Sequence, residues 1–180
     1  MLFAVYCATI SVAFGDVSWT EYFKDSLPSS GTVTISSGDS VVMNDAEMEA
    51  TKSCTVNVSE GAVLKLDTSA PPAFAFGTKC YGTVEKISSA SWPIAARNQS
   101  NFKGIYVISA GSVKINGTFC KIFGSVDNLD ESKLYIKKGA KLIYNGASAN
   151  LGNLRIYLAG EIELDTSDFS FSVFRKNETL

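Results

Sequence analysis

A repeated pattern of apolar residues constrains this chain more than any other feature of its sequence. Each copy begins with two apolar residues separated by one residue of any type. Five spacer residues follow, then a second pair of apolar residues with the same spacing, and finally an Asn or Asp. The copies span 33–44, 56–67, 105–116, 134–145 and 154–165. A chain that repeats one short unit in this way stacks similar units into a continuous core.

The repeat predicts pairs of short β-strands, because residues two apart lie on one face of a strand. Each copy contains a glycine that can bend the chain between its strands: Gly38, Gly61, Gly111, Gly139 and Gly160. Hairpins are the alternative, but the spacers lack Asn-Gly or Asp-Gly turns. We therefore predict an all-β parallel β-helix (β-solenoid) of about five to six coils. Its inward-facing residues are expected to include Ile35, Val58, Val107, Ile136 and Ile156.

The rest of the chain divides around this solenoid. Residues 1–15 are uncharged and end in Ala13-Phe14-Gly15, which is typical of a signal peptide, with a buried first strand as the alternative. Residues 16–32 are expected to form a capping helix and turn. Residues 33–180 form the solenoid, with an inserted loop at 68–104 that is either a true loop or a degenerate coil plus a loop.

The capping helix rests on local signals. Ser18 and Glu21 have the spacing of a capping box, and Trp19, Tyr22 and Phe23 share one helical face with Leu27. Such a helix would cover the apolar end of the first coil. At the other end, alternating apolar residues between Phe169 and Phe174 suggest a further strand, and a third hypothesis is that the chain is the first part of a longer solenoid.

The segments Ser18–Glu21, Gly31–Ile35 and Val58–Leu66 resemble the opening of right-handed parallel β-helix proteins. These form the pectin-lyase-like superfamily, and bacterial autotransporter passengers are similar in style. The resemblance covers most of residues 16–165 and implies the coil architecture. It also implies a choice between carbohydrate-active enzymes and non-catalytic surface proteins. No enzyme motif of the superfamily is recognisable, so no catalytic residue is assigned.

Several features fit secretion. Four Asn-x-Ser/Thr sequons make Asn57, Asn98, Asn116 and Asn177 candidates for N-glycosylation. Removal of the signal peptide leaves Cys54, Cys80 and Cys120, which suggests one disulfide and one spare thiol. Cys54–Cys80 is one of three possible pairings.

Composition excludes several classes of function. The net charge of −2 and the pI near 5.2 argue against a nucleic-acid partner, because the chain lacks the excess of cations that phosphates attract. The absence of histidine excludes Ser-His-Asp and Cys-His catalysis and His-ligated zinc. We expect no metal or other cofactor, and no membrane span in the mature chain.

Candidate binding residues come from the 68–104 segment, whose aromatic side chains suit stacking on sugar rings: Phe74, Phe76, Tyr81 and Trp92. The alternative is that these rings fill a distorted coil. Glu161, Glu163 and Asp165 share one strand face. They are either ligands for Ca²⁺ or simply the solvated face of the strand. Lysines at 114, 133, 137, 138 and 141 line the middle coils.

The sequence therefore favours a secreted or cell-surface β-solenoid that acts without catalysis, as an adhesion or structural module or a binder of polysaccharide or cell-surface glycan. The alternative is a polysaccharide lyase or glycoside hydrolase of the β-helix type, or a fragment of one.

Overall fold

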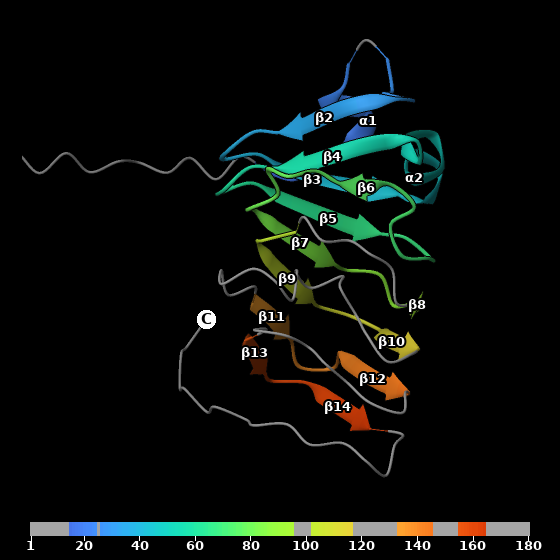
Figure 1. The fold of residues 1–180 in the computed structure, drawn as a ribbon, viewed down its shortest axis with the longest axis vertical. Coiled ribbons are helices and arrows are strands. Elements are labelled where there is room, and N and C mark those ends of the chain that lie inside the picture. Colours follow the sequence, from blue (N-terminus) through green and yellow to red (C-terminus); the bar gives the residue numbers. More distant parts are fainter. Residues whose placement is uncertain (1–14, 25, 96–101, 117–132, 146–154, 165–180) are drawn as a thin grey trace, which may run out of the picture.

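The computed structural model describes residues 15–24, 26–95, 102–116, 133–145 and 155–164. They form three parallel sheets stacked into a β-solenoid of about five turns (Figure 1). Every strand pair in these ranges is parallel, so the solenoid prediction is confirmed and the hairpin alternative is excluded there. The predicted signal peptide, except Gly15, and the possible strand at 169–174 lie outside the described residues.

The chain passes through its three sheets in a fixed order, and among the described residues one coil, at 75–95, has a strand in all three. The three-stranded sheet contains β2 (Gly31–Ile35), β4 (Cys54–Val58) and β6 (Ala75–Phe76). The seven-stranded sheet follows, with β1 (Val17–Ser18), β3 (Ser40–Asn44), β5 (Val63–Asp67), β7 (Thr83–Lys86), β9 (Ile105–Ile108), β11 (Lys133–Ile136) and β13 (Arg155–Leu158). The four-stranded sheet contains β8 (Ser91–Ala95), β10 (Ser112–Asn116), β12 (Lys141–Asn145) and β14 (Glu161–Leu164).

Glycines with positive φ bend the chain at the corners between sheets. Gly38 (φ 89°) and Gly61 (φ 79°) lie between the three-stranded and seven-stranded sheets. Gly111 (φ 61°) and Gly139 (φ 84°) lie at the next corner, between the seven-stranded and four-stranded sheets. The sequence copies are therefore not equivalent, because the first two copies span one corner and the last three span another.

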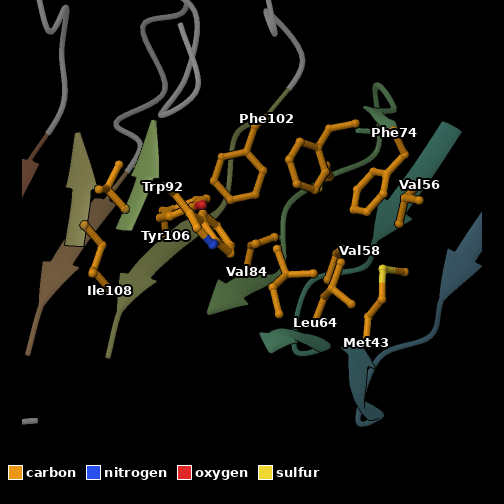
Figure 2. Packing of buried hydrophobic residues seen from close by; sticks show 14 of the residues in the cluster. Met43, Val56, Val58, Leu64, Phe74, Val84, Trp92, Phe102, Tyr106 and Ile108 are labelled. Carbon is orange, nitrogen blue, oxygen red and sulfur yellow. The ribbon is translucent and has the colours of Figure 1, made fainter. Parts of the chain in front are cut away.

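Inward-facing side chains of the seven-stranded sheet form two columns along the axis of the solenoid (Figure 2). None of these residues is more than 1% exposed, so together they remove a large apolar area from water. The first column contains Val41, Leu64, Val84, Tyr106 and Leu134, and the second contains Met43, Leu66, Lys86, Ile108 and Ile136.

The register corrects the predicted repeat in its third copy. Tyr106 and Ile108 stack on Val84 and Lys86, so the prediction that Val107 points into the core is wrong. Val107 lies on the outer face between Glu85 and Tyr135, where its neighbours cover all but 8% of it. A slip of one residue reverses the face of every side chain in a strand.

In the last copy, the inward-facing pair of the first strand lies two residues later than the repeat predicts. Ile156 and Leu158 take the two inward positions, in register with Leu134 and Ile136. The predicted inward direction of Ile156 therefore holds, but its partner in the coil is Leu158. Leu154, the partner predicted from the repeat, lies outside the described residues.

The predicted insertion at 68–104 is largely a coil. It supplies β6, β7 and β8, and Phe102 forms an isolated parallel bridge with Cys80. The segment escaped the repeat pattern because β6 is short and because Lys86 occupies an apolar position of β7. The degenerate coil, offered as an alternative from the sequence, is therefore what the structure contains in residues 75–95.

Two helices cover the first coil. In α1 (Trp19–Tyr22), the Ser18 side chain accepts a hydrogen bond from the Glu21 amide, as its spacing predicted, and Trp19 is fully buried. Leu27 lies beyond the helix and is exposed. The second helix, α2 (Asp45–Thr51), begins with a capping box formed by Asn44 and Glu47 that the sequence analysis missed.

The two helices are joined through the buried Glu47 carboxylate. Its Oε1 accepts hydrogen bonds from the Thr20 backbone amide (2.8 Å) and hydroxyl (2.7 Å). Its Oε2 accepts one from the Asn44 amide (2.8 Å). This carboxylate therefore holds the N-terminal cap onto the first coil.

Adjacent coils approach most closely at a stack of small residues. A Cβ atom on Gly104 would lie 2.0 Å from the Gly82 carbonyl oxygen, and one on Gly82 would lie 2.3 Å from the Ser59 carbonyl oxygen. These distances leave no space for a side chain.

We expect Gly104→Ala to lower the free energy of unfolding by about 2–3 kcal/mol, because the added methyl group meets rigid backbone. The control is Gly139→Ala, where φ is positive but no atom lies within 4 Å of the new Cβ. That change should cost only about 1 kcal/mol. Urea denaturation measures both, and equal losses would contradict the close contact.

Candidate functional site

The outer face of the seven-stranded sheet is the most regular polar surface in the described part of the chain. Its central row runs along the axis, one residue from each coil: Val42, Lys65, Glu85, Val107, Tyr135 and Tyr157. Successive strands lie about 4.8 Å apart, so neighbouring side chains in this row are within contact distance.

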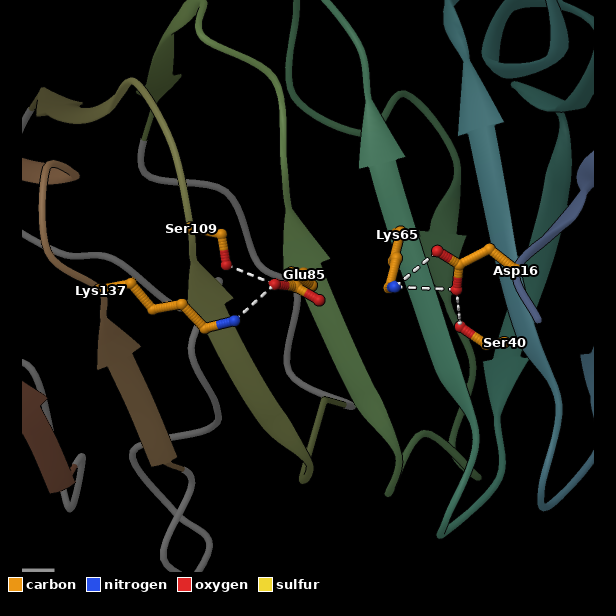
Figure 3. A network of polar contacts seen from close by, with 6 residues as sticks. All are labelled: Asp16, Ser40, Lys65, Glu85, Ser109 and Lys137. Atoms are coloured by element: carbon orange, nitrogen blue, oxygen red, sulfur yellow. Dashed lines mark hydrogen bonds and ion pairs between the residues drawn. The ribbon is translucent and has the colours of Figure 1, made fainter. Parts of the chain in front are cut away.

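The upper half of the face is an ion-pair network (Figure 3). Lys65 Nζ lies 2.8 Å from both carboxylate oxygens of Asp16, and the Ser40 hydroxyl donates to Asp16 Oδ1. Hydrogen bonds from Lys65 and Ser40 lower the pKa of Asp16.

Glu85 is the centre of a second set of contacts. It accepts hydrogen bonds from the Ser109 hydroxyl and from Lys137 Nζ, the latter at 2.9 Å. Burial acts to raise the pKa of Glu85, but these two hydrogen bonds and the charge of Lys137 outweigh it and lower the pKa. Glu85 is therefore a stable carboxylate at neutral pH.

The lower half of the face is aromatic and basic. The rings of Tyr135 and Tyr157 stack with centroids 4.3 Å apart and planes 9° from parallel. Lys133 and Arg155 are in register two residues before them, so all four side chains share the outer face. We call these four residues the tyrosine–cation patch.

The outer face of the four-stranded sheet has a different character. Lys141 Nζ lies 3.2 Å from Glu161 and 3.0 Å from Glu163, and the hydrogen bonds that it donates to Glu163 and Glu161 raise the pKa of Lys141. The two glutamates are exposed, as the solvated-surface interpretation expected. Asp165 lies outside the described residues, which contain no group of acidic or cysteine side chains arranged to hold a metal.

Most of the aromatic residues predicted to bind sugars lie inside the core. Phe74, Phe76 and Trp92 are almost completely buried, so their ring faces are not open to a ligand. These rings fill a coil, as the alternative interpretation of the sequence expected, because alternate residues of β6 and β8 face inward. Tyr81 alone of the four is exposed (46%), and Lys103 Nζ lies 5.9 Å from its ring centroid.

The suggested Cys54–Cys80 disulfide is absent. Both residues are free and buried, and Cys54 Sγ donates to the Pro28 carbonyl oxygen at 3.3 Å. Cys54 begins β4, whereas Cys80 lies beside Val58 at its other end, because Tyr81 and Gly82 donate to the Val58 carbonyl. Burial raises the pKa of Cys80 to about 12. Cys120 lies outside the described residues.

Asn57 is a poor glycosylation site in the folded chain. It is only 8% exposed, and its Oδ1 accepts a hydrogen bond from the Lys79 amide at 3.2 Å. The Asn57 side chain also packs directly against Gly77, because a Cβ atom there would lie 2.1 Å from Asn57 Oδ1. Asn98 and Asn177 lie outside the described residues, and Asn116 ends β10.

The sequence analysis missed a buried lysine in the apolar column. Lys86 lies between Leu66 and Ile108, is fully buried, and donates hydrogen bonds to the carbonyl oxygens of Ser88 (2.5 Å) and Ala110 (2.8 Å). Its Nζ also lies 5.1 Å from the centroid of Trp92. Burial lowers the pKa of Lys86 to about 8, although Asp67 opposes the shift. Lys86 could have been found from the sequence, because it is a lysine at a position where the repeat has an apolar residue.

Comparisons with known proteins provide no relative. No family model matches the chain, and neither the curated proteins nor the solved structures include a significant match. Within the described residues, the helices are too short and too polar to traverse a bilayer. The functional argument therefore depends on the chemistry of the surfaces described above.

Lys86 predicts a specific pH dependence. Because its pKa is lowered on folding, the unfolded chain binds more protons between pH 8 and pH 10.5, and stability rises with pH across that window. A shift of this size corresponds to roughly 2–4 kcal/mol. Lys86→Met should be more stable than the native chain at pH 7, and the difference should disappear near pH 10.5. Denaturant unfolding of both proteins at several pH values measures it. A pH-independent difference would contradict the shift.

Proposed function

We propose that this chain is a secreted β-solenoid that binds an acidic glycan without catalysis, as an adhesion or matrix module. The observation that carries the proposal is the tyrosine–cation patch, in which Tyr135 and Tyr157 stack beside Lys133 and Arg155 on one open sheet face.

The aromatic pair supports sugar binding. The stacked rings hold each other in place, so little side-chain entropy is lost when a ligand binds. The face of an aromatic ring attracts the C–H groups of a sugar, and the tyrosine hydroxyls can exchange hydrogen bonds with sugar hydroxyls.

The flanking charges favour an acidic ligand. An arginine can bind a carboxylate or sulfate with two parallel hydrogen bonds, and a lysine adds a flexible point charge. Because successive coils lie about 4.8 Å apart, Lys133 and Arg155 are separated along the axis by a distance close to the length of one sugar unit. A linear chain running along the axis would meet them in succession.

The carboxylates on these faces support binding rather than hydrolysis. Asp16, Glu85, Glu161 and Glu163 each lie beside a lysine. Glycoside hydrolysis needs one carboxylic acid with a raised pKa. The pKa of Glu85 is lowered, so Glu85 is unsuited to act as a general acid.

Binding to the patch is tested by isothermal titration with polygalacturonate and with the neutral cellohexaose. We expect the native chain to bind polygalacturonate and not cellohexaose, more weakly as salt increases. Replacing Lys133 and Arg155 by Gln should weaken binding about tenfold or more. Tyr135→Leu with Tyr157→Leu should also weaken it.

The matched control is Lys114→Gln, which removes an equally half-buried lysine from the outer face of the four-stranded sheet. It should leave binding unchanged. Equal losses in the control, equal binding of the neutral sugar, or release of new reducing ends from polygalacturonate would contradict the proposal.

Secretion gives a separate prediction. Expression of the full chain in a eukaryotic secretory host should release a protein whose N-terminus is Asp16, the residue that pairs with Lys65. N-terminal sequencing of the secreted protein measures this. Retention in the cytosol with an intact Met1 would contradict the signal peptide.

A further inference from the structure

The two ends of the described solenoid differ in how they are covered. At the upper end, β1 pairs with β3, and the buried Trp19 of α1 packs against the first coil. At the lower end, β13 and β14 are the last strands of their sheets, so one side of each has backbone groups without a described partner strand.

The lower end also exposes residues that are buried in every coil above it. Leu158 and Leu164 are 53% and 38% exposed, whereas Ile136 and Tyr144, their partners in the preceding coil, are at most 3% exposed. An open strand edge beside exposed apolar residues is a surface on which another β-strand can add.

We propose that this end binds a second copy of the chain, tail to tail, about a two-fold axis through the corner between β13 and β14. Strand β13 then pairs antiparallel with β14 of the second copy, and β14 pairs with β13 of the second copy. Both open edges are satisfied by one symmetric contact.

The lengths and facing of the two strands fit this arrangement. Each strand has four residues, and only Ala159 and Gly160 separate them. An axis at Ala159 places Ile156 opposite Ile162 of the second copy, and both face the core. It places Arg155 opposite Glu163 and Tyr157 opposite Glu161, all on the outer face.

Charge favours the pairing of β13 with β14 over a symmetric pairing of β14 with β14 of the second copy. Pairing of β14 with itself would bring Glu161 and Glu163 against the same residues of the second copy, and like charges opposite each other are destabilising. Pairing of β14 with β13 gives each Glu163 an arginine. A guanidinium has five donors, so Arg155 can contact Glu163 and keep its other contacts, including one with a glycan.

Stacking of the lower end on the upper end of another copy is disfavoured by the cap. Strand β1 occupies the free side of β3, and Trp19 of α1 packs against the first coil, so β2 is the one strand of that coil whose outer edge has no described partner. The closed tail-to-tail dimer is therefore preferred to an open filament. A single coil end is small for an interface, so we expect micromolar affinity.

Sedimentation equilibrium of the full chain, with a reductant present, tests the proposal. We expect a monomer–dimer equilibrium and no larger species. Leu164→Lys should raise the dissociation constant about tenfold or more, because it places a charge diagonally across from Ile156 of the second copy. Leu27→Lys is the matched control: Leu27 is 37% exposed but lies near the capped end, and its change should have no effect.

A charge exchange separates the proposed pairing from other dimers. Arg155→Glu and Glu163→Arg should each weaken the dimer, and the two together should restore most of it. Circular dichroism spectra and melting temperatures confirm that the variants fold. The proposal is overturned by a monomer at all concentrations up to about 1 mM, by a dimer that Leu164→Lys leaves intact, or by a double variant no stronger than the single ones.

Discussion

Backbone hydrogen bonds between successive coils fix the register of the seven-stranded sheet, and that register decides which side chains meet. Inside, it aligns Leu64 with Val84 and Leu66 with Lys86. Outside, it aligns Lys65 with Glu85 and Tyr135 with Tyr157. The core and the candidate binding face are therefore two results of one constraint, because alternate residues of a strand point to opposite sides. A shift of one residue would remove both together.

The sequence predicted the architecture because apolar residues two apart recur with glycines between them. The sequence did not predict which corner of the coil each copy spans, because both corners have a glycine between two pairs of apolar residues. Val107 shows the limit: Ile105 to Ile108 are four consecutive apolar or aromatic residues, so alternation cannot say which pair faces inward. Only pairing with Val84 and Leu134 settles it.

The candidate site was harder to predict than the fold. Tyr135 and Tyr157 belong to different coils, and their contact depends on the pairing of β11 with β13, which local sequence does not reveal. The aromatic residues that the sequence did single out, such as Phe74 and Trp92, fill the core beside the short strand β6 and in β8. Aromatic content marked residues 68–104 as unusual, but it did not distinguish packing from recognition.

The uneven ends of the solenoid imply a direction for local unfolding. Neighbouring coils provide most of each coil's contacts, so stability in such a chain is close to a sum over adjacent pairs. The last coil has one described neighbour, whereas the first is held by Glu47, Thr20 and Asn44 through its helices. In the monomer, amide hydrogens should therefore exchange with solvent in a gradient, fastest at β13 and β14 and slowest among the coils beneath the cap.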